Sequence, residues 1–132
     1  MSRDKSCLER IKESFENRLK DLKRFMDNLD NEEILQEFHE YGLSFDLIEV
    51  GTFEDQARPY YRYQISFGGP SDELRFYESG KVVYAFLDWF DGATIDVTNN
   101  EVITWLKEDF EEMGFIDWNR DLDLALYYSD CI

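Results

Sequence analysis

The sequence is poor in the residues that usually build catalytic and metal centres. Its 132 residues include one histidine, two cysteines and two prolines. Cys7 and Cys131 are too few and too far apart for a metal-ligand pattern, so we expect free thiols, with a disulfide between the chain ends as the alternative. His39 has no second imidazole or suitably placed serine near it, which argues against a Ser–His–Asp triad.

Long apolar runs are also missing. The longest run, residues 82–87, lies between Lys81 and Asp88 and falls far short of the ~20 residues that a membrane helix needs. The start of the sequence, MSRDKSCLER, carries charges where a signal peptide would need an apolar segment. We therefore expect a cytoplasmic protein that makes no contact with membranes.

Basic residues are scarce relative to acidic ones. The chain has 14 Lys and Arg against 30 Asp and Glu, a net charge of -16. Residues 25–57 contain ten acidic and no basic residues, whereas residues 1–24 contain eight basic and five acidic ones. A field of one sign repels nucleic acid and anionic membranes and attracts basic surfaces. We therefore exclude direct binding of DNA or RNA and expect a basic protein partner.

What remains is the composition of a folded domain. Hydrophobic residues make up 43% of the chain and aromatic residues 17%, enough for a core that buries roughly two thirds of the unfolded surface. The length fits a single domain over residues 1–132. Within this domain, the spacing of apolar residues predicts a helical hairpin at residues 1–42, an antiparallel sheet at residues 43–97, and a helix and tail at residues 98–132.

Apolar residues recur at steps of three and four over residues 4–29, which predicts a long amphipathic helix. Its apolar stripe consists of Leu8, Ile11, Phe15, Leu19, Leu22, Phe25, Met26 and Leu29. Asp30 is the expected N-cap of a second helix, and Gly42 is its expected left-handed stop. These two helices form the predicted hairpin.

Alternating apolar residues and glycine-rich turns predict strands between the helices. We expect strands over residues 43–53 and 60–67, around Leu74 and Phe76, and over residues 82–90. The expected fold is α+β, with an antiparallel sheet of about four strands flanked by two N-terminal helices and one or two C-terminal helices.

A short extended piece at residues 95–97 leads into the predicted C-terminal helix. Thr98 and Glu101 have the spacing of a capping box, which places the helix start at Thr98. Gly114 is expected to end the helix. The tail, residues 115–132, is apolar enough to dock on the domain, either as a short helix or as an edge strand.

Four carboxylates at or near the expected turns are candidates for a metal site or an acid–base pair: Asp72, Glu73, Asp88 and Asp91. If the turns GGPSDE and DWFDGA share one end of adjacent strands, these oxygens could gather around Mg²⁺ or Ca²⁺. Asp88 lies on an apolar strand face, where a carboxylate without a partner would be costly. We expect a backbone N–H, a tyrosine hydroxyl, Arg62, Arg75 or a metal ion to satisfy it.

Other catalytic patterns are not supported. Gly68 and Gly69 lack the lysine and the Ser/Thr of a phosphate loop and do not form a dinucleotide fingerprint. Neither cysteine has the neighbours of an activated thiol. We therefore expect no cofactor and no enzymatic activity.

Acidic residues on the expected outer helix faces are the candidate partner-binding surface: Glu33, Glu37, Glu40, Glu108, Asp109, Glu111 and Glu112. Residues four apart, such as Glu33 and Glu37, lie about 6 Å apart along a helix axis. Such rows can imitate a phosphate backbone to a protein that binds nucleic acid. The alternative is an ordinary solvated face.

The segments GGPSDE and DWFDGA resemble the core of small uncharacterised proteins carried by phages and other mobile elements. The overall size and charge are similar to those of anti-CRISPR and anti-restriction proteins that act as DNA mimics. This resemblance implies a non-enzymatic inhibitor that occludes the basic nucleic-acid-binding surface of a defence nuclease or CRISPR effector, in the host cytoplasm if a phage encodes it. The alternatives are a metal-dependent enzyme or metal-binding domain, and an immunity-type partner of one cognate protein.

Overall fold

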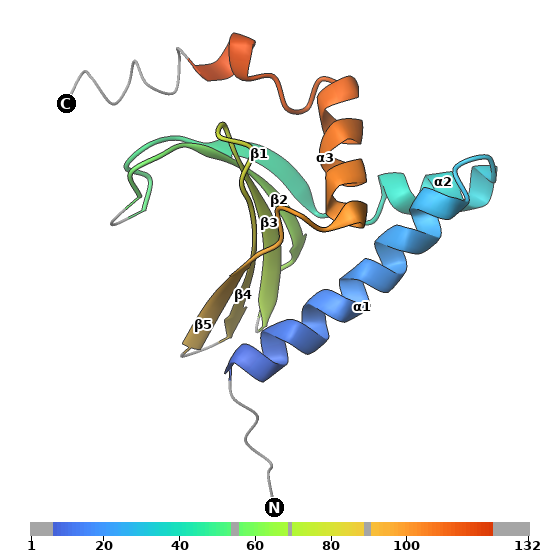
Figure 1. Ribbon diagram of the computed structural model, residues 1–132, viewed down its shortest axis with the longest axis horizontal. Helices are drawn as coiled ribbons and strands as arrows, with labels where there is room; N and C mark the ends of the chain where they lie inside the picture. Colours follow the sequence, from blue (N-terminus) through green and yellow to red (C-terminus); the bar gives the residue numbers. More distant parts are fainter. Residues whose placement is uncertain (1–6, 54–55, 69, 89–90, 123–132) are drawn as a thin grey trace, which may run out of the picture.

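A computed structural model describes residues 7–53, 56–68, 70–88 and 91–122, without the side chains of Cys7 and Asp91. The elements run in the order α1 (Cys7–Asp27), α2 (Glu32–His39), β1 (Ser44–Ile48), β2 (Tyr60–Ser66), β3 (Ser71–Tyr77), β4 (Val82–Asp88), β5 (Asp91–Asp96) and α3 (Glu101–Glu112). Helices precede and follow an antiparallel sheet (Figure 1). The α+β expectation is therefore confirmed, with five strands rather than four.

The sheet is a meander in which each strand pairs with the next one along the chain, in the order β1-β2-β3-β4-β5. Antiparallel neighbours need only short connections, which suits the turn-rich sequence. Tyr63 lies opposite Leu74, Leu74 opposite Tyr84, and Tyr84 opposite Ile95. This register places a continuous row of apolar residues across four strands, on one face of the sheet.

The hydrophobic core fills the space between that face and the helices α1 and α3, which lie on the same side of the curved sheet (Figure 1). Ile11, Phe15, Leu22 and Phe25 of the predicted α1 stripe are buried in it, as expected. Leu8, at the start of that stripe, is instead half exposed. Buried core members from the sheet and from α3 include Tyr61, Tyr63, Ile65, Leu74, Phe76, Tyr84, Phe86, Ile103, Leu106 and Phe110.

The strand boundaries differ from the prediction at both edges of the sheet. β1 ends at Ile48, and the chain then turns, with the N–H of Thr52 donating to the carbonyl of Glu49 at 3.1 Å. β5 is a strand of six residues rather than a short extended piece, and β4 ends at Asp88, opposite Asp91. Because β5 contains few apolar residues, the alternation pattern did not predict that it pairs with β4 over its whole length.

Asparagine side chains begin both α2 and α3. Asn31 and Asn100 are the N-caps, so the expectations of Asp30 and Thr98 are wrong. In each helix the amide oxygen accepts hydrogen bonds from the second and third backbone N–H groups, at 2.9–3.2 Å. The Thr98 hydroxyl is occupied elsewhere, because it donates to Asp96 at 2.5 Å.

The two glycines predicted to end helices have different roles. Gly114 adopts a φ of 83° directly after α3, the left-handed conformation expected of it. α2 instead ends at Glu40 in a right-handed conformation, and Gly42 is not among the glycines with positive φ. A Cβ atom at Gly42 would lie 2.1 Å from Cε1 of Tyr63. Gly42 is therefore needed for the close approach of the backbone to that ring.

The C-terminal part is described only as far as residue 122. Residues 118–122 are helical, which agrees with the first of the two alternatives for the start of the tail. Trp118 packs edge-on against Tyr61, with 4.6 Å between ring centroids. Cys131 and the rest of the tail lie outside the described residues. None of the described helices has the length and apolarity needed to cross a membrane.

We predict that Gly42→Ala lowers the free energy of unfolding by about 1–3 kcal/mol, the usual cost of overpacking. The added methyl group must displace the Tyr63 ring, whereas a glycine-to-alanine change at an unstrained site would stabilise the protein through the unfolded state. Urea denaturation measures the difference. Ser44→Ala, at an exposed neighbouring position, serves as the control and should have little effect. An equal response of the two variants would contradict the close-approach role.

Candidate protein-interaction surface

Asp72 ties helix α1 to the sheet. Its side chain is 2% exposed and lies on the face of β3 that the helices cover. Arg18 of α1 donates from Nε to Oδ2 at 2.7 Å and from Nη2 to Oδ1 at 2.9 Å, a bidentate pair. The hydroxyl of Tyr84 donates to Oδ2 at 2.5 Å, and that of Ser66 donates to Oδ1. Both carboxylate oxygens are therefore satisfied by protein donors.

The same hydrogen-bond network continues away from Asp72 in two directions. Ser14 Oγ lies 2.6 Å from the hydroxyl of Tyr84. Arg18 also donates to the hydroxyl of Tyr41 at 3.1 Å, and Tyr41 donates to Asp21 at 2.6 Å. The network therefore joins α1, three strands and the segment after α2.

The shifted pKa values in this network favour an ionised Asp72 and a protonated Tyr84. Burial acts to raise the pKa of Asp72, but hydrogen bonds from Arg18, Ser66 and Tyr84 outweigh it and leave the pKa below its ordinary value. Burial and the neighbouring Asp72 raise the pKa of Tyr84, so its hydroxyl stays protonated and donates. Asp72 is therefore an ionised structural group whose oxygens are already occupied.

Two more of the four candidate carboxylates also pair with arginines. Glu73 lies on the opposite face of β3, is 4% exposed, and accepts a hydrogen bond from Nε of Arg75 at 2.8 Å. Asp88 forms an ion pair with Arg10 of α1. Arg10 was not among the partners expected for Asp88, because it comes from the helix that covers the sheet and not from the sheet itself.

The described side chains do not gather these carboxylates around a common point. Asp72 and Glu73 lie within β3 rather than in a turn, and successive residues of a strand point to opposite faces. Asp91 lies opposite Asp88 in the register, but its side chain is outside the described part. Among the described residues, no group of three or more His, Cys, Asp or Glu could hold a metal ion. The described geometry therefore does not favour the metal alternative.

The arginines of the basic first helix make contacts inside the protein. Arg10 and Arg18 pair with carboxylates of the sheet, and Arg24 pairs with Glu37 of α2. Lys23 pairs with Asp27 one turn further along α1, at 3.2 Å. The arginines of α1 are therefore paired with the domain's own carboxylates.

The acidic residues of α2 are exposed, but they are not equivalent. Phe38 is buried on the inner side of the helix, and Glu33 and Glu40 are exposed. Glu37 is neutralised by its ion pair with Arg24. Glu40 accepts a hydrogen bond from Gln36 at 2.7 Å, which leaves its charge uncompensated.

The acidic residues of α3 occupy its last two turns. Glu108 and Glu112 are exposed and four residues apart, which places them on one face of the helix. Glu111 is exposed on a flank. Oδ2 of Asp109 is buried and has no hydrogen-bond partner among the described residues. Burial and the nearby Glu112 raise the pKa of Asp109, while His39 acts to lower it.

An aromatic contact joins the two helices. Phe38 of α2 packs on Trp105 of α3, with 5.4 Å between ring centroids. The acidic residues of these two contacting helices are here called the α2–α3 acidic surface: Glu33, Glu37, Glu40, Glu108, Asp109, Glu111 and Glu112. Glu37 is the member paired with Arg24.

Acidic residues at the end of α3 oppose the helix dipole. The C-terminal end of a helix carries partial negative charge, so a carboxylate there costs about 0.3–1 kcal/mol. α3 has no basic residue in its last turn to offset this repulsion. Helix stability therefore does not account for the position of these charges.

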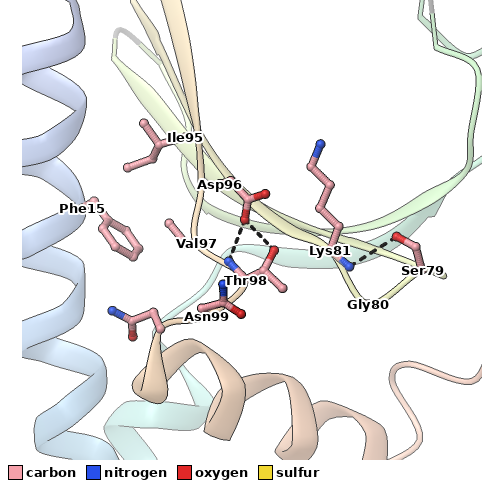
Figure 2. A pocket seen from close by; sticks show the side chains of 10 residues that line it. Phe15, Ser79, Gly80, Lys81, Ile95, Asp96, Val97, Thr98 and Asn99 are labelled. Atoms are coloured by element: carbon pink, nitrogen blue, oxygen red, sulfur yellow. Dashed lines mark hydrogen bonds between the residues drawn. The ribbon is translucent and has the colours of Figure 1, made fainter.

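The largest of the described pockets lies elsewhere, between α1, the β3–β4 turn and the segment before α3 (Figure 2). It measures about 1000 Å³, and Asp96 is the only carboxylate among its described lining residues. Asp96 accepts hydrogen bonds from the backbone and the hydroxyl of Thr98, as Figure 2 shows. The carboxylate in this pocket therefore stabilises a turn, and the described lining residues do not form a set of reactive groups.

Comparisons of the chain with protein-family models, curated proteins and solved structures found no match. The functional argument therefore depends on the geometry and charge described above. Sequence reasoning missed Arg10 and Arg18 as partners of the sheet carboxylates. Arg18 lies three residues after Phe15 and four before Leu22, so its place on the buried stripe was visible in the spacing.

We predict that Asp72→Ala lowers the free energy of unfolding by about 3–5 kcal/mol, because it leaves Arg18 without its carboxylate. Asp88→Ala is the matched control. It breaks an ion pair that is more exposed to solvent, so its loss should be smaller than that of Asp72→Ala. Chemical denaturation at neutral pH measures both losses, and similar losses would contradict the central role of Asp72.

The same variant should change the acid stability of the protein. Since the folded-state pKa of Asp72 is lowered, its stabilising contribution is present above the unfolded value of about 3.9 and is lost as the pH falls through the folded-state pKa. Below that range, Asp72→Ala and the wild type should approach one another in stability. A difference that stays constant with pH would show that the loss does not come from the charge.

We predict that Glu112→Gln raises the free energy of unfolding by about 0.3–1 kcal/mol, because it removes a charge from the negative end of α3. Glu101→Gln, at the first residue of the same helix, is the control and should act in the opposite direction. Urea denaturation at low salt measures both effects, and added salt should shrink them. Shifts of the same sign in the two variants would contradict this account.

Proposed function

We propose that this protein is a non-enzymatic binding protein whose α2–α3 acidic surface occupies the basic nucleic-acid-binding surface of a partner protein. A defence nuclease or a CRISPR effector is the class of partner that we propose. The observation that carries the proposal is the contact of Phe38 with Trp105, which joins two helices rich in acidic residues, together with the lack of a basic residue in the last turn of α3. Surfaces of complementary charge steer association and set its salt dependence.

The distribution of basic residues supports this proposal. The arginines of α1 are engaged with Asp72, Asp88 and Glu37, and they leave the other acidic residues of α2 and α3 uncompensated. The basic first helix therefore does not weaken the analogy with an acidic mimic, because its charge is used within the fold. It acts as a scaffold for the acidic surface.

The cost of the acidic positions also supports a role in binding. Glu108, Glu111 and Glu112 crowd the negative end of α3, and Glu112 acts to raise the pKa of Asp109. A charge added for solubility alone could stand at many exposed positions without this penalty. A basic partner would remove the repulsion on binding, so the same charges would favour the complex.

The proposal does not identify the partner. An immunity-type complex with one cognate protein would use the same acidic surface. The two cases differ in what the bound partner loses: a mimic blocks the partner's nucleic-acid binding, whereas an immunity-type protein can inhibit elsewhere.

We predict that the wild-type protein captures a basic nucleic-acid-binding protein from bacterial lysate at low salt, and less of it at moderate salt. Glu108→Gln/Glu112→Gln should reduce capture by roughly tenfold, the equivalent of about 1.4 kcal/mol. Glu16→Gln/Glu78→Gln removes the same charge from exposed positions outside this surface and should leave capture unchanged.

A competition assay completes the test. The captured protein should lose its DNA or RNA when the wild-type protein is added, and should keep it when the Glu108→Gln/Glu112→Gln variant is added. Equal capture by both double variants would mean that only net charge matters, which would contradict a dedicated surface. Capture without loss of nucleic acid would favour the immunity-type alternative.

A further inference from the structure

An apolar pocket opens beside the α2–α3 acidic surface. It measures about 400 Å³ and lies where the end of α2, the start of β1 and the end of α3 meet. Phe45, Phe110 and Tyr63 are among the aromatic residues that line it. Pockets that hold small ligands measure about 300–1000 Å³, so the space is sufficient for one large side chain.

Large apolar side chains at this pocket are left in contact with solvent. Leu43 is 63% exposed, Met113 is 44% exposed and Phe115 is 45% exposed, and all three line the pocket. Single exposed apolar residues are common on protein surfaces, whereas a group around a cavity is typical of an interaction site. Removal of these three side chains from water would favour binding of an apolar group.

Acidic residues directly adjoin several of the pocket's lining residues in the sequence. His39 lines the pocket and directly precedes Glu40, and Phe110, another lining residue, directly follows Asp109. Met113, another lining residue, directly follows Glu112. An apolar centre with a charged rim is the usual anatomy of a protein–protein interface.

The charge of the rim decides between possible occupants. A second copy of this chain would bring like charges together, because a two-fold symmetric contact places the same acidic rim on both sides. A nucleic acid would be repelled by the same charges. A basic protein segment with an apolar residue at its centre satisfies both the pocket and the rim.

We propose that this pocket is the anchor point of the partner, and that it takes one aromatic or other large apolar side chain flanked by lysines or arginines. The inference rests on the proposed function and specifies the chemistry of the partner's contact. A few buried aromatic anchors usually carry most of the affinity of an interface. Charge therefore guides the approach of the partner, and the anchor slows its release.

Two peptides of identical charge test the proposal: a lysine-rich peptide with a central tryptophan, and the same peptide with alanine in its place. Binding to the full chain is measured by fluorescence anisotropy at low and moderate salt. The tryptophan peptide should bind at least tenfold more tightly, as expected of an interface anchor. Its advantage over the alanine peptide should persist as salt weakens the binding of both.

Variants of the exposed lining residues locate the binding site. Leu43→Ser and Met113→Ser should each remove most of the advantage of the tryptophan peptide. Leu8→Ser is the control, because Leu8 is similarly exposed but lies at the start of α1, and it should change nothing. Circular dichroism checks that each variant remains folded.

The outcomes separate this inference from the proposed function. Equal, salt-sensitive binding of both peptides would overturn the anchor and leave the charged surface standing. Failure of both peptides to bind at low salt would overturn both proposals. A tryptophan advantage unchanged in Leu43→Ser and Met113→Ser would place the anchor elsewhere and overturn this pocket. Self-association that blocks the tryptophan peptide would identify a second copy as the occupant and overturn the basic partner.

Discussion

The bidentate ion pair between Arg18 and Asp72 is the interaction on which the arrangement of the helices depends. A buried charge pair contributes little net stability, because its desolvation offsets the attraction. Its importance is geometric, since any displacement of α1 would leave a buried carboxylate without its charged partner. Tyr84 and Ser66 complete that carboxylate's hydrogen bonds. Through α1, the pair also fixes α2, because Phe25 packs on Phe38 at 5.5 Å.

This construction separates the charges of the chain. The arginines of α1 form ion pairs with two carboxylates of the sheet and one glutamate of α2. Few other basic residues lie on α2 and α3. The strongly negative net charge is therefore not spread evenly over the molecule. The ion pairs of the α1 arginines leave most acidic residues of α2 and α3 without a basic partner among the described residues. The same ion pairs fix the position of α1 relative to the sheet and to α2.

The fold class could be predicted from the sequence because the helical spacing and the strand alternation of its apolar residues are both strong. Strand boundaries were predicted wrongly where residues typical of turns interrupt that alternation. Asp72 follows the apolar spacing of Leu74 and Phe76, yet the glycines and proline before it suggested a turn. Asp88 was therefore expected to be the costly carboxylate, while Asp72 is the one that is fully buried. The partners of both residues come from α1, and no local pattern reveals contacts between residues so far apart in the sequence, such as the 54 positions between Arg18 and Asp72.

The acidic surface and the apolar pocket together argue against solubility as the reason for either feature. Charges placed for solubility would avoid the negative end of a helix, and solubility would not be served by exposed Leu43, Met113 and Phe115 around a cavity. Each feature taken alone lowers the stability or the solubility of the free protein. Both become favourable in a complex with a basic partner, because the partner neutralises the carboxylates and covers the apolar group. The proposed binding function therefore accounts for both features, whereas stability and solubility account for neither.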